Sequence, residues 1–578
     1  MSWGERLRVP QTSPGNRWIN YDIRPIESSR RTWGFLTFNN FWILINLSIP
    51  TYLTGSALIP LGLTWWQAII CIVIGNILAT IFLVVNSLPG AYYNLGFPVV
   101  NRSVWGMWGS QFPIWNRIFL ALVWYGFNSW VGGECVYVML QAMDVNIERH
   151  VKNTMPAGMG VTTAQFIAYI VFFVVCLPVA LIRPHKLNKF ILVTSAITVV
   201  FFLALLIWAL ATMGPAGFGD TISGGTGIPK TGGSNSVAWL SVYGIVSTIG
   251  SIAAGILSQN DYARFAKRPR HAIAGQAFSF PFYSIICSVI GILVTAATQH
   301  RFGGEAIWSP PLLLSRLITE NPTAGTRAGT FFAGLAITLS QIGLNVPGGA
   351  LIGGFDLAAT FPEYINIRRG AYIVIFTSIA VNPWKLVSTP TVFLTVLSSY
   401  SVFLAPMTGI MVASYLVVNK RKLNTDDLYR SDKSGIYWYT FGVNWRAPVS
   451  WIVGIAPIMP GFVASVNKSI SIPDSLIQLY FMSYIYGFFS SAVVYVVLHV
   501  VFPAPSLDTF VKSEASATET IQKSKANWEN LDYRPWAVGD RDDEEDDASH
   551  AQFFQGISKE PAAGVDAPSG SPGSSGLS

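Results

Sequence analysis

The sequence predicts an all-α polytopic membrane protein, and three observations indicate this class. Of the 578 residues, 51% are hydrophobic and only 12% are charged, against about 25% charged in an average soluble domain. Apolar runs of about 20 residues, the length that crosses the hydrocarbon of a bilayer, recur along the chain. Lys and Arg gather in alternate connections between these runs, as they do in membrane proteins with a fixed orientation.

The apolar runs predict twelve transmembrane helices. They cover about 39–62, 66–88, 113–140, 164–182, 189–213, 237–258, 276–298, 328–351, 371–386, 391–418, 446–466 and 477–501. A polar N-terminal tail, 1–38, precedes this twelve-helix core, 39–501. The remainder, 502–578, is rich in Ser, Ala, Gly, Pro and acidic residues, a composition that predicts a disordered tail.

Basic residues fix the predicted orientation. The connections that carry most of them lie on one side, which the positive-inside rule makes cytoplasmic, and both tails fall on that side. These residues are Arg102, Arg183, Lys186, Lys189, Arg264, Lys267, Arg268, Arg270, Arg368, Arg369, Lys420, Arg421, Lys422, Arg430, Lys433 and Arg446. The N-terminus lacks an apolar leader, so the first span is expected to direct insertion. Topology accounts for the net charge of +7, and no nucleic-acid partner is expected.

The cysteines and histidines do not suggest a metal site. All four cysteines fall inside predicted spans, and the six histidines are scattered over six segments. No disulfide framework and no structural metal is therefore expected. A polytopic enzyme would need converging His, Asp or Glu side chains, and the sequence argues against this class.

The third predicted span carries a tryptophan and an asparagine one turn apart, Trp124 and Asn128. A helix turns by about 100° per residue, so these two side chains share one face. The indole can stack on a flat heterocycle, and the amide can hydrogen-bond the edge of that ring. The alternative is that Trp124 is packing and Asn128 joins neighbouring helices.

The first span contains a helix break near Ser48 and Pro50. Proline removes a backbone donor and clashes with the carbonyl one turn earlier. Broken backbone at membrane depth is tolerated where it lines a cavity, so the break indicates a substrate or cation region. A simple proline kink is the alternative.

The sixth span has a stretch of small residues around Gly250. This stretch is either a second unwound helix or a close-packing surface. It lies five spans after the first break, which suggests two five-span halves in inverted topology, followed by two additional C-terminal helices.

The eighth span, like the third, carries amide side chains at membrane depth. Gln341, Asn345 and Gly349 are four residues apart and share one face of a regular helix. The adjoining Pro347 weakens that helix. We therefore expect amides and a glycine gap at membrane depth in a substrate site.

Glu134 is the clear carboxylate at depth, where a charge costs on the order of 3 kcal/mol unless it is paired or protonated. It is a possible proton site. However, its helical angle is roughly 80° from Trp124 and about 120° from Asn128, so it faces away from the expected ligand and packing is an equal alternative. Asp261, at the end of the sixth span, is expected to pair with Arg264 or Lys267.

Several segments together carry a family resemblance that runs from about Asn20 to Val501. The chain resembles the nucleobase:cation symporter family, in its fungal branch of uracil, allantoin and urate permeases. The segments are Asn86 to Ala91, Trp124 to Gly133, Ser258 to Lys267, Asn345 to Asp356, Tyr364 to Gly370, Asn382 to Trp384 and Val443 to Arg446.

The resemblance implies a five-plus-five inverted-repeat fold with two further helices and alternating access. The ligand is expected between spans one, three, six and eight. Trp124 and Asn128 match the stacking tryptophan and the edge-binding amide of the family, and Asn345 matches the first of two asparagines in span eight. A plasma membrane location with both termini cytoplasmic is also implied.

Departures from the family pattern limit this comparison. Gly349 stands where many members have a second asparagine, so that contact is lost or passes to Asn345 or Gln341. Ile252 stands at a position that is aromatic in some members, which leaves the ring stacked on one side. Gly343 and Leu344 lack the hydroxyls of sodium-dependent relatives, so a proton is the expected coupling ion, and no cofactor is expected.

The leading hypothesis is a secondary active transporter that imports a small planar heterocycle, such as uracil, allantoin or a related purine product, by proton symport. The alternatives are a nutrient sensor on a transporter fold and a carrier for a different heterocycle such as a vitamin. The expected partners are the heterocycle and the lipid bilayer. The tails offer Lys512, Lys523 and Lys525 to the ubiquitylation and trafficking machinery, with plain solvated lysines as the alternative.

Overall fold

The computed structural model describes residues 18–19, 22–181, 188–214, 233, 236–430, 433–467 and 469–529. This part of the chain is helical, and its β-structure is limited to two isolated bridges, Trp33 with Ala266 and Thr440 with Val443. The predicted all-α class is therefore confirmed.

The described helices follow one another in the predicted order. Those of the first half are η1 (Ser28–Arg30), α2 (Phe35–Asn46), α3 (Ile49–Ser56), α4 (Trp65–Asn86), α5 (Leu88–Tyr93), α6 (Phe97–Trp105), α7 (Gln111–Met143), α8 (Ile147–His150), η2 (Ala157–Met159), α9 (Thr163–Leu181), α10 (Asn188–Ala211), α11 (Val237–Ser251), α12 (Ala253–Ser258) and α13 (Asn260–Ala263). Those of the second half are α14 (Pro269–Gln299), α15 (Pro310–Glu320), α16 (Ala324–Asn345), η4 (Val346–Ala350), α17 (Leu351–Thr360), α18 (Ile367–Thr377), η5 (Ser378–Val381), η6 (Pro383–Lys385), α19 (Pro390–Ala413), η7 (Ser414–Val418), η8 (Asp427–Tyr429), η9 (Ile436–Trp438), α20 (Arg446–Ile455), α21 (Met459–Val466), α22 (Asp474–Phe481), α23 (Ser483–Val501), α24 (Pro505–Lys512) and α25 (Ala517–Glu529).

Among the described residues, seven helices are long and apolar enough to cross a membrane, and an eighth span forms if the bent pair α20 and α21 is one. Four other predicted spans lie outside that set: α2 with α3, α7, α11 with α12, and α18. The first and third of these are broken, and α18 is short. α7 is long, but its Trp, Gly, Asn, Arg and Glu residues lower its hydropathy.

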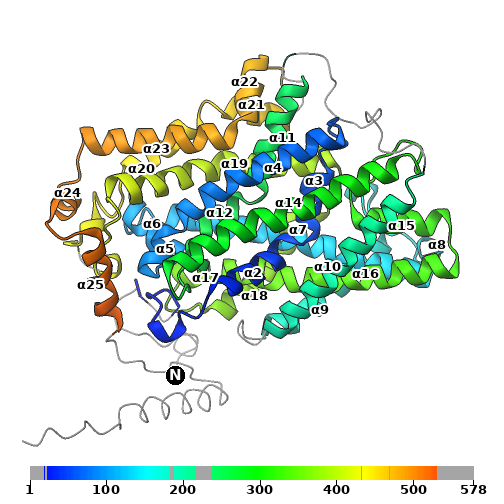
Figure 1. Cartoon of the computed structure of the whole chain (residues 1–578), viewed down its shortest axis with the longest axis horizontal. Coiled ribbons are helices and arrows are strands. Elements are labelled where there is room, and N and C mark those ends of the chain that lie inside the picture. Colours follow the sequence, from blue (N-terminus) through cyan, green and yellow to red (C-terminus); the bar gives the residue numbers. More distant parts are fainter. Residues whose placement is uncertain are drawn as a thin grey trace, which may run out of the picture. The chain divides into compact units, whose positions relative to one another are not determined.

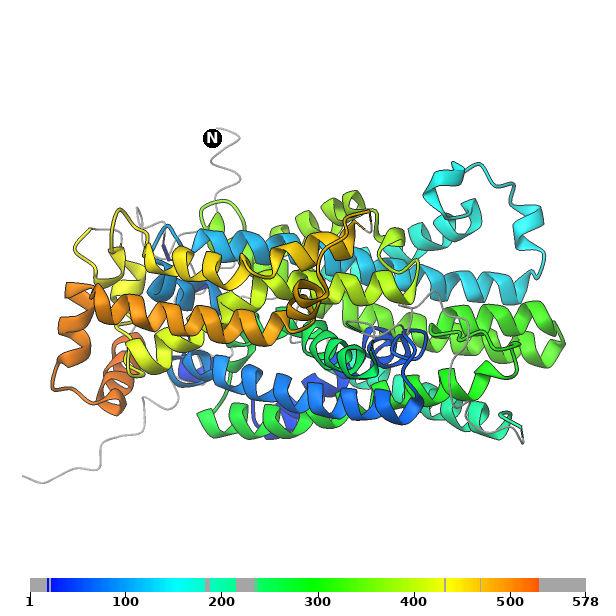
Figure 2. The ribbon, with the colours of Figure 1, turned by 90° about the horizontal axis from the view of Figure 1, so that it is seen from above.

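Different short helices lie at the two ends of the helix bundle. Figure 1 shows α5, α6, α24 and α25 at one end and α8 and α15 at the other, and the view from above agrees (Figure 2). The first end includes α6, which carries the basic residue Arg102, and the 419–445 connection. Arg102 and this connection therefore lie at the same end of the bundle.

The first and sixth spans are both discontinuous. α2 ends at Asn46 and α3 begins at Ile49, with Leu47 and Ser48 between them. Pro50 lies in the first turn of α3, where its missing N–H needs no partner. α11 and α12 are separated at Ile252, whose backbone angles are φ −113° and ψ 6°. Span six is therefore interrupted at Ile252, and Gly250 also packs closely against α19, so both interpretations of this stretch apply.

The eighth span runs from Ala324 to Thr360 and changes its helical pitch in the middle. α16 passes into the π-helix η4, which contains Pro347 and two glycines, and then into α17. A π-helical turn is wider than an α-helical one and is frequent at functional sites. It rotates the residues after Asn345 away from the positions that a regular helix would give them.

Two helices continue the chain where the composition predicts a disordered tail. In α24, Leu507 and Val511 are four residues apart and buried. Lys422 Nζ donates to the Val511 carbonyl at 2.9 Å, and the Trp528 ring of α25 lies 4.9 Å from that of Tyr429. Leu507 and Val511 form a small apolar face that the mostly polar composition of this region did not indicate. The acidic run after 540 lies outside the described residues.

Candidate functional site

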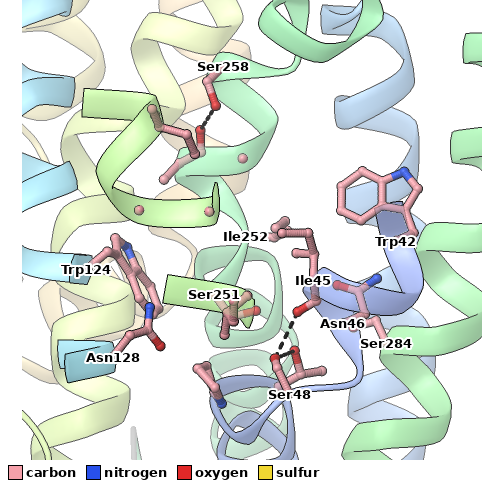
Figure 3. A pocket seen from close by; sticks show the side chains of 18 of the residues that line it. Trp42, Ile45, Asn46, Ser48, Trp124, Asn128, Ser251, Ile252, Ser258 and Ser284 are labelled. Carbon is pink, nitrogen blue, oxygen red and sulfur yellow. Dashed lines mark hydrogen bonds between the residues drawn. The ribbon is translucent and has the colours of Figure 1, made fainter. Parts of the chain in front are cut away.

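A buried cavity lies between the two broken helices, α7 and the π-helical region of the eighth span. The cavity volume is about 160 Å³, comparable to the roughly 150 Å³ cavity that holds a benzene ring. Figure 3 shows Trp124 and Asn128 on the α7 side, with Ile45, Asn46 and Ser48 across the cavity from them. The walls thus come from the four spans in which the sequence places the site, together with Phe280 and Ser284 of α14.

Trp124 and Asn128 both line this cavity. The indole is half-buried and is held by edge-to-face contacts with Phe127, at 5.2 Å, and Tyr400, at 6.1 Å. The Asn128 side chain is 7% exposed, and its Oδ1 has no hydrogen-bond partner among the described residues. A buried amide oxygen without a partner costs about 1–3 kcal/mol. A ligand N–H would remove that cost.

Gln341 and Asn345 are fully buried and are not among the described residues that line the cavity. Asn345 Nδ2 donates to Ser129 Oγ at 2.8 Å, which ties the eighth span to α7. Both polar side-chain atoms of Gln341 lack partners in the described part of the chain. Because the π-helix follows Asn345, the glycines Gly348 and Gly349 reach the wall while the two amides lie behind it.

Gly349 fits tightly against α7. A Cβ atom placed there would lie 3.2 Å from Tyr125 Cδ2 and 3.4 Å from Asn345 Oδ1. The neighbouring Gly348 has more room, since its nearest contact would be Ile45 Cδ1 at 3.5 Å. A side chain at 349 therefore requires Tyr125 to give way by a few tenths of an ångström.

The two helix breaks contribute differently. Ser48 and Pro50 line the cavity, and Ser48 Oγ donates to the Ile45 carbonyl at 2.8 Å. Gly250 does not belong to the described lining. Its carbonyl accepts a hydrogen bond from Tyr400 Oη at 2.7 Å, and it faces α19, where a Cβ would lie 2.8 Å from the Leu397 carbonyl oxygen. Ser251 and Ile252 line the cavity in its place.

A buried charge cluster borders the cavity at the end where α13 and α17 meet α7. The Arg117 guanidinium donates to both carboxylate oxygens of Asp356 and to Asp261 Oδ2 at 2.5 Å. Arg117 lines the cavity. Asp261 also accepts from the Phe97 backbone N–H at 2.8 Å. The expected ion pair of Asp261 thus forms with Arg117, 144 residues away, rather than with its sequence neighbours.

Glu134 is half-buried and is not among the described lining residues, in agreement with its helical angle. Within the described chain there is no group of three or more His, Cys, Asp or Glu side chains that could hold a metal ion.

Gln259 is a cavity residue that the sequence reasoning did not identify. It lies between α12 and α13, is 0% exposed and lines the cavity. Neither its Oε1 nor its Nε2 has a partner among the described residues. The polar run from Ser258 to Asp261 at the end of an apolar span was the available signal, but only the fold shows which of these side chains faces the cavity.

Broken helices around a buried, ring-sized cavity define a multi-pass membrane transporter. Residues 25–487 match the family of permeases for cytosine/purines, uracil, thiamine and allantoin. The chain belongs to this family, as the resemblance predicted.

Known relatives agree with that assignment. The allantoin permease of Saccharomyces cerevisiae is 34% identical over 490 residues, covering 84% of this chain and 76% of the permease. The thiamine transporter of the same yeast is 32% identical over 484 residues, covering 84% and 79%. The structure of Mhp1, a nucleobase-cation-symport-1 family transporter in a closed conformation with bromovinylhydantoin bound, aligns with a TM-score of 0.65 at 19% identity, covering 88% of this chain and all of that one. This likeness confirms the transporter fold.

Proposed function

We propose that this chain imports a small planar heterocycle, such as uracil, allantoin or a related nucleobase or purine product, across the plasma membrane by proton symport with alternating access. Both termini are then cytoplasmic. The observation that carries the proposal is that Trp124 and Asn128, one helical turn apart, both face a buried cavity between two broken helices. The ring stacks on the indole, and a ring N–H satisfies Asn128 Oδ1.

A vitamin-sized heterocycle is the second candidate, since the thiamine transporter is a relative of comparable identity. The two candidates differ in charge and size. A competition panel of labelled uracil, allantoin, uridine and thiamine, run at pH 5 and pH 7 with and without sodium, identifies the substrate and the ion together. Sodium-dependent, pH-independent uptake would contradict proton coupling.

The first prediction tests the stacking residue. Trp124→Ala should reduce uptake to near background, because base–aromatic stacking contributes about 1–3 kcal/mol, or roughly 10- to 100-fold in affinity. Trp115→Ala is the matched control, since Trp115 is on the same helix, is 48% exposed and is not in the described lining. Surface amount is measured by fluorescent tagging. Normal uptake by a Trp124→Ala protein at normal surface amount would contradict the site.

For the coupling proton, the geometry favours Asp356 over Glu134. Asp356 is 0% exposed and is bonded to Arg117, which lines the cavity, whereas Glu134 is half-buried and outside the described lining. Protonation of Asp356 would weaken its bond to Arg117 and so link the proton to the cavity wall.

The second prediction compares these two carboxylates. Asp356→Asn keeps the shape and removes the titrating group, so uptake should lose its dependence on the proton gradient, with accumulation falling about tenfold. Glu134→Gln should keep that dependence. Accumulation is measured with and without a protonophore. If uptake by Asp356→Asn still depended on the proton gradient and uptake by Glu134→Gln did not, Glu134 would be the residue that carries the coupling proton.

A further inference from the structure

The Gln259 side chain makes no hydrogen bond among the described residues, whereas the side chains next to it in sequence do. Ser258 Oγ donates to the Ala254 carbonyl at 2.9 Å, a bond drawn in Figure 3. Asn260 Oδ1 accepts from the Gly90 backbone N–H at 2.7 Å, and Asp261 bonds Arg117. In contrast, both polar atoms of the Gln259 side chain are buried without a partner in the described part of the chain, and Gln259 belongs to the cavity lining. A carboxamide in that state is available to a ligand.

Gln259 lies at a different depth from the Trp124 and Asn128 pair. It is two residues from Asp261, which bonds Arg117, and Arg117 is seven residues before Trp124 on α7. Seven residues of helix span about 10 Å. A ligand of one ring therefore meets Asn128 and Gln259 in succession, not at once. By the basic-residue rule, the Gln259 end of the cavity is the cytoplasmic one.

We propose that Gln259 forms a second, release-side subsite that takes the amide edge, –NH–C(=O)–, of a neutral cyclic ureide or lactam after the ring leaves Trp124. This inference rests on the proposed function. A carboxamide offers one acceptor and two donors, so its Oε1 accepts from the ring N–H while its Nε2 donates to the adjacent ring carbonyl.

The surroundings of Gln259 match a neutral, flat ligand. The nearby Arg117 is already bonded to two carboxylates, so the described lining residues include no uncompensated cation for an anionic ligand. Tyr262 and Leu120 line the same region. The Tyr262 ring is held by Phe41, at 4.4 Å, and stacks on Trp33, at 6.2 Å. The subsite thus combines an aromatic wall with one carboxamide.

The first experiment measures uptake by the full-length transporter. Gln259→Leu removes both hydrogen bonds and should raise the KM for uracil or allantoin about tenfold, while inhibition by the fully N-methylated analogue of the same compound, which retains only the carbonyl contact, should weaken by less. Trp124→Ala should weaken both compounds, so failure of the stacking site and failure of the Gln259 subsite are distinguishable. Gln259→Glu, which keeps an acceptor and loses the donors, should be intermediate.

The second experiment needs no substrate. An unpartnered buried amide does not stabilise the empty protein, so purified Gln259→Leu should melt no lower than the wild type. Gln276→Leu is the matched control: Gln276 is also 0% exposed, but its Nε2 donates to the Ala272 carbonyl at 2.8 Å and it lies outside the described lining. This variant should melt several degrees lower. A Gln259→Leu protein that melts as low as Gln276→Leu, or that takes up uracil and allantoin with an unchanged KM, would overturn the proposal.

Discussion

The helices α4 and α7 show two ways of building a membrane span. α4 exposes a stripe of large apolar side chains at helical spacing, Trp66, Ile70, Ile74, Ile77 and Ile81, toward the lipid. α7 instead buries most of its length among other helices and carries Arg117, Asn128 and Glu134. Lipid contact requires only apolar surface, whereas a cavity wall requires polar groups whose partners lie on other helices.

This difference explains which spans hydropathy detects. The helices that are long and apolar enough to cross a membrane include α4, α9, α10, α14, α19 and α23. Three of the five spans that line the cavity fall outside the set, namely α2 with α3, α7, and α11 with α12, whereas α14 and the eighth span belong to it. Hydropathy is therefore weakest in the two broken spans and in the span that carries Trp124 and Asn128.

The largest expected effect follows from removing the charge partner of a cavity span. Arg117→Leu leaves Asp261 and Asp356 buried without their guanidinium, which costs about 3–5 kcal/mol. We expect little folded protein at the surface, measured by tagged surface amount and by thermal unfolding in detergent. The variant that also carries Asp261→Asn and Asp356→Asn should recover part of the folded protein. A stable Arg117→Leu single variant would show that the cluster is not structural.

Local patterns predicted the parts of the fold and site that depend on a few neighbouring residues. The shared face of Trp124 and Asn128 follows from helical spacing, and the break before Pro50 follows from its missing N–H. The structure contains both features: Trp124 and Asn128 line the same cavity, and the helix is broken just before Pro50. The function of these residues still depends on the uptake experiments.

Features made by distant residues could not be predicted in this way. Arg117 and Asp356 are 239 residues apart in sequence, and no local rule joins them. The one-face arrangement of Gln341, Asn345 and Gly349 assumed a regular helix, whereas η4 widens the turn after Asn345. The position of α24 depends on the burial of Leu507 and Val511 against another part of the chain. Each of these outcomes is decided by packing against another part of the chain.

A smaller effect is expected at the glycines of the π-helix. Gly349→Ala should lower stability by about 1 kcal/mol, because its Cβ would press on Tyr125 Cδ2 at 3.2 Å. Gly348→Ala introduces the same atom with its nearest contact at 3.5 Å and should leave stability unchanged or slightly raised. Thermal unfolding of both purified variants measures the difference. Equal melting temperatures would mean that Tyr125 yields freely and that Gly349 is not required by close packing.

The smallest effect is expected on the lipid-facing side. Ile77→Ala in α4, where the side chain is 51% exposed, should change the free energy of unfolding by less than about 0.5 kcal/mol, because lipid replaces the lost apolar contact. Ile72→Ala on the same helix, where the side chain is 0% exposed, leaves a cavity and should cost about 2–5 kcal/mol. Both are measured by thermal unfolding in lipid nanodiscs. If Ile77→Ala proved as destabilising as Ile72→Ala, the stripe on α4 would be a protein contact surface, and the contrast between the two kinds of span would fail.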